Sequence, residues 1–242
     1  MEQPATAIVT GAGKRIGARI AGALVERGWT VLAHVRNSGD FVPAGTLKVA
    51  AELTATDCAA TIFSAAKGLP PVRLLVNNAA RFSWDGFGEF SADELDAHMH
   101  ANVRAPLLLI EELARRHEGG DALVVNMLDS KLLAPNPDFL SYTLSKQALM
   151  GATDLAARAL AHKGIRVNGI APALMLRSHG QSEANYRAMH ARNPLGRGVT
   201  PEDVMAAIDY LLAARSVTGE VLTIDGGQRF DPPGRDVQFL EP

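Results

Sequence analysis

The sequence predicts an α/β domain built on a doubly wound parallel sheet of seven strands, with helices on both faces of the sheet. Three observations lead to this fold class. The chain has 242 residues, enough for one large domain with an extensive core. Short runs rich in valine, isoleucine and leucine alternate with segments of helical periodicity, which is typical of parallel sheets buried on both faces. A glycine-rich segment, GAGKRIG, directly follows the first of these runs.

The predicted strands are short and mostly apolar, as strands buried on both faces should be. The first, ATAIVT, leads into the glycine-rich segment, and the sixth, IRVNGI, is broken by Pro172. The carboxyl ends of parallel strands form the edge where α/β proteins bind their ligands. In chain order, we expect strands at 5–10, 30–35, 47–50, 73–76, 121–127, 165–170 and 221–224.

Helical periodicity connects these strands, and capping residues mark two of the helix starts. Ser91 can cap a long helix with Glu94 in the capping-box position, and Thr200 can cap the last helix. His98 and His100 lie two apart and do not share a helical face, so we interpret both as surface residues. We expect helices at 18–27, 56–67, 93–117, around 142–146 and at 201–214.

No internal repeat or linker divides the chain, so we expect a single domain over residues 1–242. Its cofactor-binding half covers about 1–120, and its catalytic and substrate half covers about 121–227. The polar segment 173–194 has few strong anchors and could be a mobile flap over a substrate. A short tail with three prolines, 228–242, follows.

Composition and charge favour a protein that acts on small molecules. Hydrophobic residues make up 47% of the chain and charged residues 21%, as in ordinary globular proteins. A net charge of −2 offers no basic field for nucleic acid or an anionic membrane. The N-terminus lacks a signal-peptide pattern, and no apolar run approaches the ~18 residues of a membrane span. With Cys58 as its single cysteine, the chain cannot form an internal disulfide or a thiolate metal cluster, and we expect a cytoplasmic protein.

The glycine-rich segment between the first strand and the first helix predicts a dinucleotide site. Such a turn lets the backbone approach a pyrophosphate and directs helix N–H groups at it. In a dinucleotide-binding fold, the end of the second strand then meets the adenosine ribose. An acidic side chain there would accept a hydrogen bond from the 2′-hydroxyl. This chain instead has His34 and Arg36 there, beside Asn37 and Ser38. A cation with neighbouring donors suits a 2′-phosphate, so we expect NADP or NADPH as the cofactor rather than NAD.

The fourth strand ends in the small and amide side chains of Asn77, Asn78, Ala79 and Ala80. Such residues leave space and hydrogen bonds for a ligand in the crevice at the edge of the sheet. Four aromatic residues follow closely and suggest the wall or lid of a pocket: Phe82, Trp84, Phe87 and Phe90.

The groups suited to proton transfer lie in residues 129–146, DSKLLAPNPDFLSYTLSK. Tyr142 and Lys146 are four apart and therefore share a helical face. An isolated tyrosine titrates near pH ~10, and an adjacent ammonium favours the phenolate, so we expect Lys146 to lower the pKa of the phenol. Asp129 stands just beyond the carboxyl end of the fifth strand, at the ligand-binding edge.

Together these motifs resemble the short-chain dehydrogenase/reductase family over about residues 5–227. The likeness is carried, in this order, by Thr10-Gly11 to Gly17, Asn77-Asn78-Ala79, Asn102, Tyr142-x-x-x-Lys146 and Asp225-Gly226-Gly227. The resemblance implies a Rossmann-like fold and a homotetramer. The residues expected to bind the cofactor are Gly11, Lys14, Arg15, Ile16, Gly17, His34, Arg36, Asn37, Ser38, Leu53, Asn78, Ala79, Tyr142, Lys146 and Pro172.

Departures from the common family pattern resemble its pteridine reductases, including the dihydromonapterin reductases. Arg15 stands where a middle glycine is usual, and Asp129, thirteen residues before Tyr142, stands in the place of a serine. Phe82 matches a phenylalanine that in those enzymes sandwiches the pterin against the nicotinamide.

The resemblance implies a role for each of these residues. Tyr142 would donate the proton, Lys146 would hold the nicotinamide ribose, and Asn102 would support a proton relay through water. Asp129 would contact the pterin or help to deliver the proton, since a carboxylate accepts bonds from ring N–H and amino groups. Arg15 would lie between the cofactor phosphates and the pterin. The expected substrate residues are Arg15, Phe82, Asp129 and Tyr142.

We therefore expect an NADPH-dependent oxidoreductase that transfers hydride to a pterin-like C=N, converting a dihydropterin or dihydrofolate to its tetrahydro form. The alternative is a carbonyl reductase or alcohol dehydrogenase of the same family, in which Asp129 is tolerated in the place of serine. A non-catalytic NADPH-binding module is less favoured, because Tyr142 and Lys146 are both present. We expect a small-molecule substrate and no nucleic-acid or membrane partner, and the tail after Gly227 could reach a neighbouring subunit's site.

Overall fold

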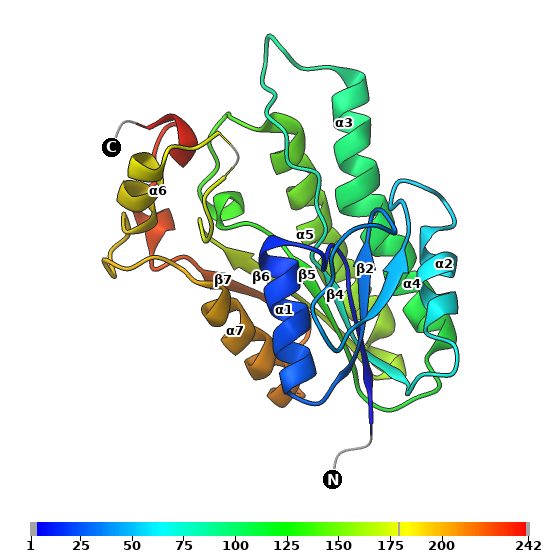
Figure 1. Cartoon of the computed structure of the whole chain (residues 1–242). Coiled ribbons are helices and arrows are strands. Elements are labelled where there is room, and N and C mark those ends of the chain that lie inside the picture. The colour runs from blue at the N-terminus through cyan, green and yellow to red at the C-terminus, as the bar shows by residue number, and fades with distance from the viewer. Residues whose placement is uncertain (1–3, 179, 241–242) are drawn as a thin grey trace.

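The computed structural model describes residues 4–178 and 180–240, so residues 1–3, 179 and 241–242 of the predicted domain, flap and tail lie outside the described residues. Its centre is one sheet of seven parallel strands in the order β3-β2-β1-β4-β5-β6-β7 (Figure 1). The predicted fold class is confirmed. The strands are β1 (Thr6–Val9), β2 (Thr30–Val35), β3 (Leu47–Ala50), β4 (Val72–Asn77), β5 (Ala122–Met127), β6 (Ile165–Pro172) and β7 (Val221–Ile224).

The strand order reverses beside β1, because the chain first moves outward to β3 and then returns to place β4 on the other side of β1. Doubly wound sheets bind ligands at this switch point, outside the carboxyl ends of their strands. The glycine-rich turn follows β1, Asn77 ends β4, and Asp129 lies two residues after β5. The topology therefore brings the predicted motifs to one edge of the sheet.

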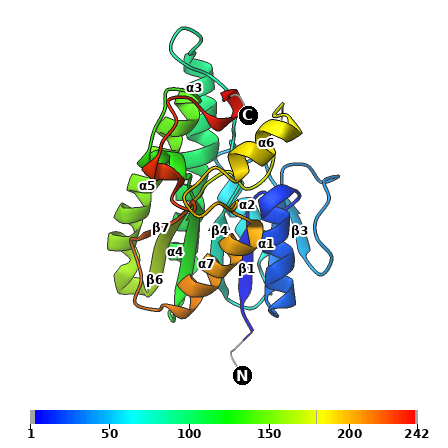
Figure 2. The same cartoon turned by 90° about the vertical axis from the view of Figure 1, so that its left-hand side faces the viewer.

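Helices cover both faces of the sheet (Figures 1 and 2). The helices are α1 (Arg15–Glu26), α2 (Cys58–Ala65), α3 (Ala92–Met99), α4 (Ala105–Arg116), α5 (Leu140–Leu160), α6 (Glu183–His190) and α7 (Pro201–Ala213). Leu24 of α1 and Ile208 of α7 pack with Val9 in one core, whereas Leu109 of α4 packs with Ile8 in the other. Ile8 and Val9 enter different cores because successive strand side chains point to opposite faces. Each fully buried side chain of this kind stabilises the fold by about 1.5–3 kcal/mol.

The helix predicted at 93–117 is one uninterrupted helical segment in the structure, but it is not α-helical throughout. A π-helical turn, His100–Arg104, joins α3 to α4. Ser91 caps α3 as expected, with its Oγ accepting a bond from the Glu94 N–H at 3.2 Å. The full capping box is not formed, because the Glu94 carboxylate instead accepts bonds from Arg81 and Ser83. Turns of π-helix often mark functional sites, and this one contains Asn102.

The sequence predicted that Pro172 breaks the sixth strand. In the structure, Pro172 is instead the last residue of β6. It pairs in register with Ile224 of β7. Alternate backbone groups of a strand face opposite neighbours, and the Ala173 N–H donates to Ile224 at 2.9 Å. Pro172 therefore faces the side of β5, whose ladder has already ended with Met127 opposite Ile170. Because proline has no N–H, the ladder between β5 and β6 cannot continue at this residue.

The polar segment 173–194 contains α6, and the C-terminal tail lies beside this helix (Figure 2). The Tyr186 hydroxyl donates to the Met175 carbonyl at 2.9 Å and ties α6 to the end of β6. Over residues 4–178 and 180–240, no helix is long and apolar enough to cross a membrane. Within the same ranges, no group of three or more histidine, cysteine, aspartate or glutamate side chains is arranged to hold a metal ion.

Candidate active site

The glycine-rich turn after β1 fits a phosphate group. Gly11 has a left-handed φ of +65°, and a Cβ on Gly17 would lie 2.1 Å from the Gly11 carbonyl oxygen. The start of α1 has no side-chain cap and no acidic residue in its first turn. The first N–H groups of a helix need an acceptor from outside the helix, and a phosphate can provide it. This part of the chain therefore suits the pyrophosphate of a dinucleotide.

Replacing Gly17 with alanine is expected to weaken NADPH binding at least tenfold. The added Cβ cannot fit, so α1 must move away from Gly11, at a cost of about 1–3 kcal/mol or more. Gly22→Ala in the same helix is the matched control, because its Cβ would meet only Pro43, at 3.9 Å. Titration of NADPH fluorescence gives both affinities. Equal affinities for the two variants would contradict the required close approach.

Asn78 supports the turn through its side chain. Its Nδ2 donates to the Thr10 carbonyl at 2.8 Å, while the Thr10 Oγ accepts bonds from the N–H groups of Asn78 and Ala79. These bonds join the end of β4 to the end of β1. Direct contact of Asn78 or Ala79 with the cofactor stays a prediction.

His34 does not face the predicted 2′-phosphate position. It is 2% exposed, its Nδ1 accepts a bond from the Gly11 N–H at 3.2 Å, and its Nε2 lies 2.9 Å from the Ala51 carbonyl. This pattern requires a neutral imidazole with the proton on Nε2. Burial also lowers the pKa of His34, which favours the neutral form. The buried His34 therefore supports the glycine-rich turn from the protein interior and is not a cation for the cofactor.

The end of β2 presents a paired charge to solvent. Arg36 has a 74% exposed side chain, and its Nε lies 2.7 Å from an oxygen of Glu52. Asn37 and Ser38 beside it are exposed, whereas Leu53 is buried. The edge thus holds both a guanidinium suited to a phosphate and a carboxylate suited to a ribose hydroxyl.

Arg15 connects the start of α1 to the segment after β6. Its guanidinium donates to the carbonyl groups of Leu176 and Arg177 at 3.2 and 2.9 Å. The residue itself has a left-handed φ of 52°, which is uncommon outside glycine. Lys14 beside it is exposed, and Ile16 packs against the core beneath α1. The predicted position of Arg15 between phosphate and pterin stays a prediction.

Asp129, Tyr142 and Lys146 meet beyond the carboxyl ends of β5 and β6. The Tyr142 hydroxyl donates to Asp129 Oδ2 at 2.9 Å, and Asp129 Oδ1 accepts the Lys131 N–H at 2.9 Å. Lys146 Nζ donates to the Met127 carbonyl at 2.6 Å and lies 5.8 Å from the centre of the Tyr142 ring. The spacing of four residues in α5 places the ammonium beside the phenol, as predicted.

The expected effect of Lys146 on the phenol is wrong in this structure. Burial and the adjacent Asp129 raise the pKa of Tyr142 well above its ordinary value. Burial also raises the pKa of Asp129 and lowers the pKa of Lys146 to about 8. The carboxylate 2.9 Å from the phenol disfavours the phenolate, and this effect opposes that of the ammonium.

Asn102 is fully buried and supports the site indirectly. Its side chain bonds to both backbone groups of Arg81, at 2.7 and 3.0 Å, and donates to Ser145 Oγ at 2.9 Å. These bonds join the segment after β4 to α5. The Asn102 side chain has no bond to Tyr142 or Lys146 in the described part of the chain, and its role in a proton relay stays a prediction.

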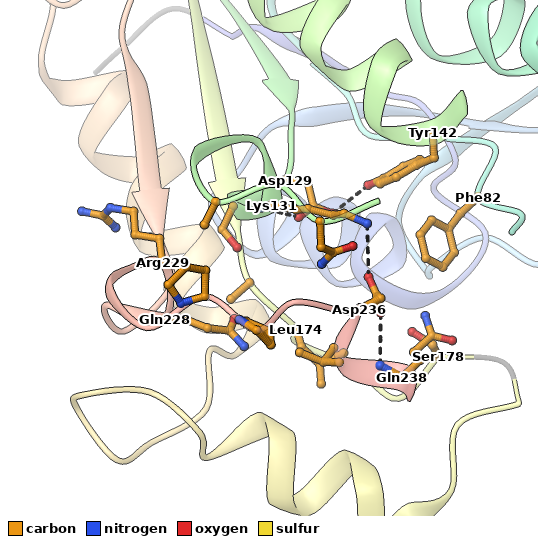
Figure 3. A pocket seen from close by; sticks show the side chains of 17 residues that line it. Phe82, Asp129, Lys131, Tyr142, Leu174, Ser178, Gln228, Arg229, Asp236 and Gln238 are labelled. Carbon is orange, nitrogen blue, oxygen red and sulfur yellow. Dashed lines mark hydrogen bonds and ion pairs between the residues drawn. The ribbon is translucent and has the colours of Figure 1, made fainter. Parts of the chain in front are cut away.

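Phe82 lies at the site, as predicted. Its ring stacks on Phe139 with 4.4 Å between ring centres and meets the Tyr142 ring edge-on at 4.7 Å. Its exposed fraction of 45% leaves part of the ring facing the pocket. Figure 3 shows Phe82 beside Tyr142 at the margin of that pocket. One face of the ring is thus covered by Phe139, and the exposed part of the ring remains available to a ligand.

Asp85 is a site residue that the sequence analysis missed. Helix α5 begins after Phe139, which has a left-handed φ and provides no side-chain cap. Asp85 caps the helix from the loop after β4, because its carboxylate accepts the Ser141 N–H at 2.9 Å and the Ser141 hydroxyl. A cap that comes from 56 residues away has no local sequence signature.

Asp85→Ala is expected to lower the melting temperature by several degrees and to raise the KM of the substrate. Loss of a helix cap costs about 0.5–2 kcal/mol, and this carboxylate also holds the loop with Phe82 against the start of α5. Asp96→Ala, an exposed aspartate in α3, is the matched control. Thermal denaturation and steady-state kinetics measure the two effects. Identical behaviour of both variants would exclude the cap.

His98 is fully buried, in contrast to its interpretation as a surface residue. Its Nδ1 lies 2.9 Å from the Glu94 carbonyl, and its ring centre is 6.5 Å from that of Tyr142. His98 is buried because α3 packs against α5, and the side of α3 that carries His98 faces the protein interior. A spacing of two residues separates the two histidines but does not identify which one is buried.

A pocket opens beside Asp129 and Tyr142 (Figure 3). Phe82 and Lys131 line one side, and residues of the C-terminal tail, including Asp236, line the other. The tail thus lies over the pocket of its own chain, and its reach to a neighbouring subunit's site stays a prediction. The tail residues were not predicted to belong to the site.

Comparison with known proteins identifies the family of this site. A family model described as enoyl-(acyl carrier protein) reductase matches residues 11–229. The chain belongs to the short-chain dehydrogenase/reductase family. Dihydromonapterin reductase of Klebsiella pneumoniae is 28% identical over 235 residues, covering 94% of this chain and 98% of the relative. L-xylulose reductase of Bos taurus is 32% identical over 231 residues, covering 91% and 95%.

Two solved structures superpose on this chain over most of their length. FolM alternative dihydrofolate reductase 1 from Brucella suis, in complex with NADP, superposes with a TM-score of 0.86 at 32% identity, over 97% of this chain and 98% of that one. A 4-hydroxyisoleucine dehydrogenase complexed with NADH has a TM-score of 0.84 at 24% identity, over 92% and 98%, and supports the fold alone. This short-chain dehydrogenase/reductase is thus an oxidoreductase that depends on a nicotinamide cofactor.

Proposed function

We propose that this enzyme reduces a pterin-like C=N with NADPH, converting a dihydropterin or dihydrofolate to its tetrahydro form. The observation that carries the proposal is the buried carboxylate of Asp129, 2.9 Å from the Tyr142 hydroxyl in a pocket beside Phe82. Reduction of a ketone needs groups that donate to a carbonyl oxygen. A pterin instead offers ring N–H and amino groups, which a carboxylate can accept.

The chain's own residues explain how a proton would reach the ring nitrogen. Bound NADPH supplies the hydride to the carbon of the C=N. Tyr142 would give its proton to the nitrogen, and its bond to Asp129 would carry a replacement proton to the phenol. Recovery of the proton through the 2.9 Å bond means that a phenolate with a strongly raised pKa does not have to persist.

We propose NADP rather than NAD as the physiological cofactor. The exposed guanidinium of Arg36 at the end of β2 supports this choice, and the FolM structure was solved in complex with NADP. The paired Glu52 would have to share Arg36 with the 2′-phosphate. A lower KM for NADPH than for NADH is the expected result, and a lower KM for NADH would contradict it.

The reaction class is tested by following NADPH oxidation at the nicotinamide absorbance. Dihydrobiopterin, dihydromonapterin and dihydrofolate are offered in parallel with a diketone. Turnover of at least one pterin and little turnover of the diketone is the expected result. Turnover of the diketone alone would reject the pterin proposal and leave the family assignment intact.

The second candidate function is carbonyl reduction within the same family. The relative named L-xylulose reductase supports it, because its identity to this chain, 32%, is similar to that of the pterin-related proteins. In that case the substrate carbonyl would have to accept a bond from Tyr142 in competition with Asp129. The diketone and a ketose in the same assay distinguish this function.

We also propose that the enzyme assembles as a homotetramer, as the family resemblance implies. Three leucines support an apolar contact on the outer surface of α4 and α5: Leu107, Leu144 and Leu155, with 41%, 42% and 68% of their surfaces exposed. Light scattering in solution measures the mass directly, and a monomeric mass would reject the proposal.

A further inference from the structure

The C-terminal tail forms a strap over the pocket, which we define as residues 228–240. Helix-like turns at Gln228–Phe230 and Val237–Phe239 flank a stretch that contains Pro232 and Pro233. Figure 2 shows this segment passing beside α6, and Figure 3 shows Asp236 and Gln238 at the pocket. The strap therefore forms the wall of the pocket that lies opposite Asp129.

Side chains of two other elements fasten the strap. Asp138, 5% exposed, accepts two bonds from the Arg235 guanidinium at 2.8 Å and one from the Asp236 N–H at 2.7 Å. On α6, Asn185 donates to the carbonyl groups of Val237 and Leu240 at 3.2 and 2.6 Å. These bonds involve buried groups on the protein side, so the position of Asp236 is set by the fold.

Asp236 places a second carboxylate in the pocket. Its side chain is 13% exposed, one oxygen accepts the Gln238 N–H at 3.1 Å, and the other lies 3.6 Å from Lys131 Nζ. Its charge adds to the burial that raises the pKa values of Asp129 and Tyr142. Asp236 is thus close enough to affect the reacting groups without touching either of them.

The two cationic side chains that line the pocket, Lys131 and Arg229, already interact with acceptors of the protein. Lys131 donates to the Asp138 carbonyl and faces Asp236, and Arg229 lies 2.7 Å from Asp225. An anionic substituent on a substrate would therefore find no free cation among the described lining residues. A hydroxyl or amino group would instead find carboxylate and amide oxygens that can accept its bond.

We infer that Asp236 is a specificity-determining residue that accepts hydrogen bonds from hydroxyl groups on the substrate, away from the bond that is reduced. This inference rests on the proposed function and names its substrate class, a pterin with a neutral, hydroxylated side chain. The strap selects such a substrate over one that lacks the hydroxyl groups and over one with an anionic side chain. Neither the fold class nor the proton-transfer residues require a carboxylate at this position.

The experiment compares wild-type enzyme with Asp236→Asn, which keeps the shape of the side chain and the acceptor for Gln238. Asp231→Asn is the matched control, because Asp231 is an exposed strap residue outside the pocket lining. The substrate pairs are dihydromonapterin with 6-methyl-dihydropterin, which lacks hydroxyl groups, and a ketose with a diketone. The readout is the ratio of kcat/KM within each pair, which cancels effects common to both substrates.

Asp236→Asn is expected to lower the preference for the hydroxylated member roughly tenfold, because a bond to a charged acceptor is replaced by a weaker bond to a neutral one. The ratio for Asp231→Asn should equal that of wild type. An unchanged ratio for Asp236→Asn, or an equal change in the control, would overturn the inference.

Wild-type enzyme alone tests the proposed function, independently of the variants. If it reduces only the carbonyl pair, the pterin proposal fails, and the ketose-to-diketone ratio still tests the role of Asp236. If it prefers the unhydroxylated member of the pair that it reduces, the inference fails while the proposed function stands. Turnover of neither pair would contradict both.

Discussion

The Tyr142→Phe enzyme is expected to lose most of its turnover while it binds NADPH with near-normal affinity. The hydroxyl is the group that would protonate the substrate, and it bonds to Asp129 at 2.9 Å. General acid catalysis contributes about 10²- to 10⁴-fold in rate, or roughly 3–5 kcal/mol of barrier. Phenylalanine keeps the ring that packs against Phe82, so the fold should be retained. Single-turnover kinetics and a fluorescence titration with NADPH measure the two quantities.

Lys146 provides a comparison for this result. Its ammonium donates to the Met127 carbonyl and lies 5.8 Å from the centre of the Tyr142 ring. Lys146→Met should reduce both turnover and NADPH affinity if the lysine holds the nicotinamide ribose. A fully active Tyr142→Phe enzyme would exclude the phenol as the proton donor.

The second large effect is expected for Asp129→Ser, which should weaken pterin reduction more than carbonyl reduction. Loss of the carboxylate removes an acceptor for pterin N–H groups, and a bond to a charged group contributes about 1.5–3 kcal/mol, or about 10- to 100-fold in kcat/KM. The same loss removes a cause of the raised pKa of Tyr142. The phenol then becomes a better acid for a carbonyl oxygen, so the two activities should diverge.

Asp129→Asn separates charge from shape in this test. Asparagine retains an oxygen that can accept the Lys131 N–H, so the turn after β5 should persist. The expected order of kcat/KM for the pterin is wild type, then asparagine, then serine. An equal fall of pterin and carbonyl reduction in the serine variant would show that the carboxylate is structural.

Most of the fold follows from local patterns. Apolar runs such as those at β1 and β2 identified the strands, and Thr200 forms the predicted N-cap of α7. The spacing of Tyr142 and Lys146 is also local, because four residues on a helix share a face. The apolar runs, the N-cap and the helical spacing each depend on residues close together in the sequence. They could therefore be predicted without knowledge of the tertiary structure.

Incorrect predictions arose where a distant group decides the state of a side chain. His34 was expected to contact the cofactor, but the Gly11 N–H and the Ala51 carbonyl fix it as a neutral, buried ring. Lys146 was expected to acidify Tyr142, but burial and Asp129 have the opposite effect. A pKa depends on burial and on nearby charges, and neither is readable from spacing alone.

The sequence by itself determined the fold class, the turn for the dinucleotide and the pairing of Tyr142 with Lys146, because hydrophobic period and helical spacing act over a few residues. Only the tertiary structure decided that Asp85 caps α5 and that the strap closes the pocket. The bond between Asp138 and Arg235 joins residues 97 apart in the chain. Its formation depends on how α5 and the end of β7 lie at the same edge of the sheet, which no local pattern encodes.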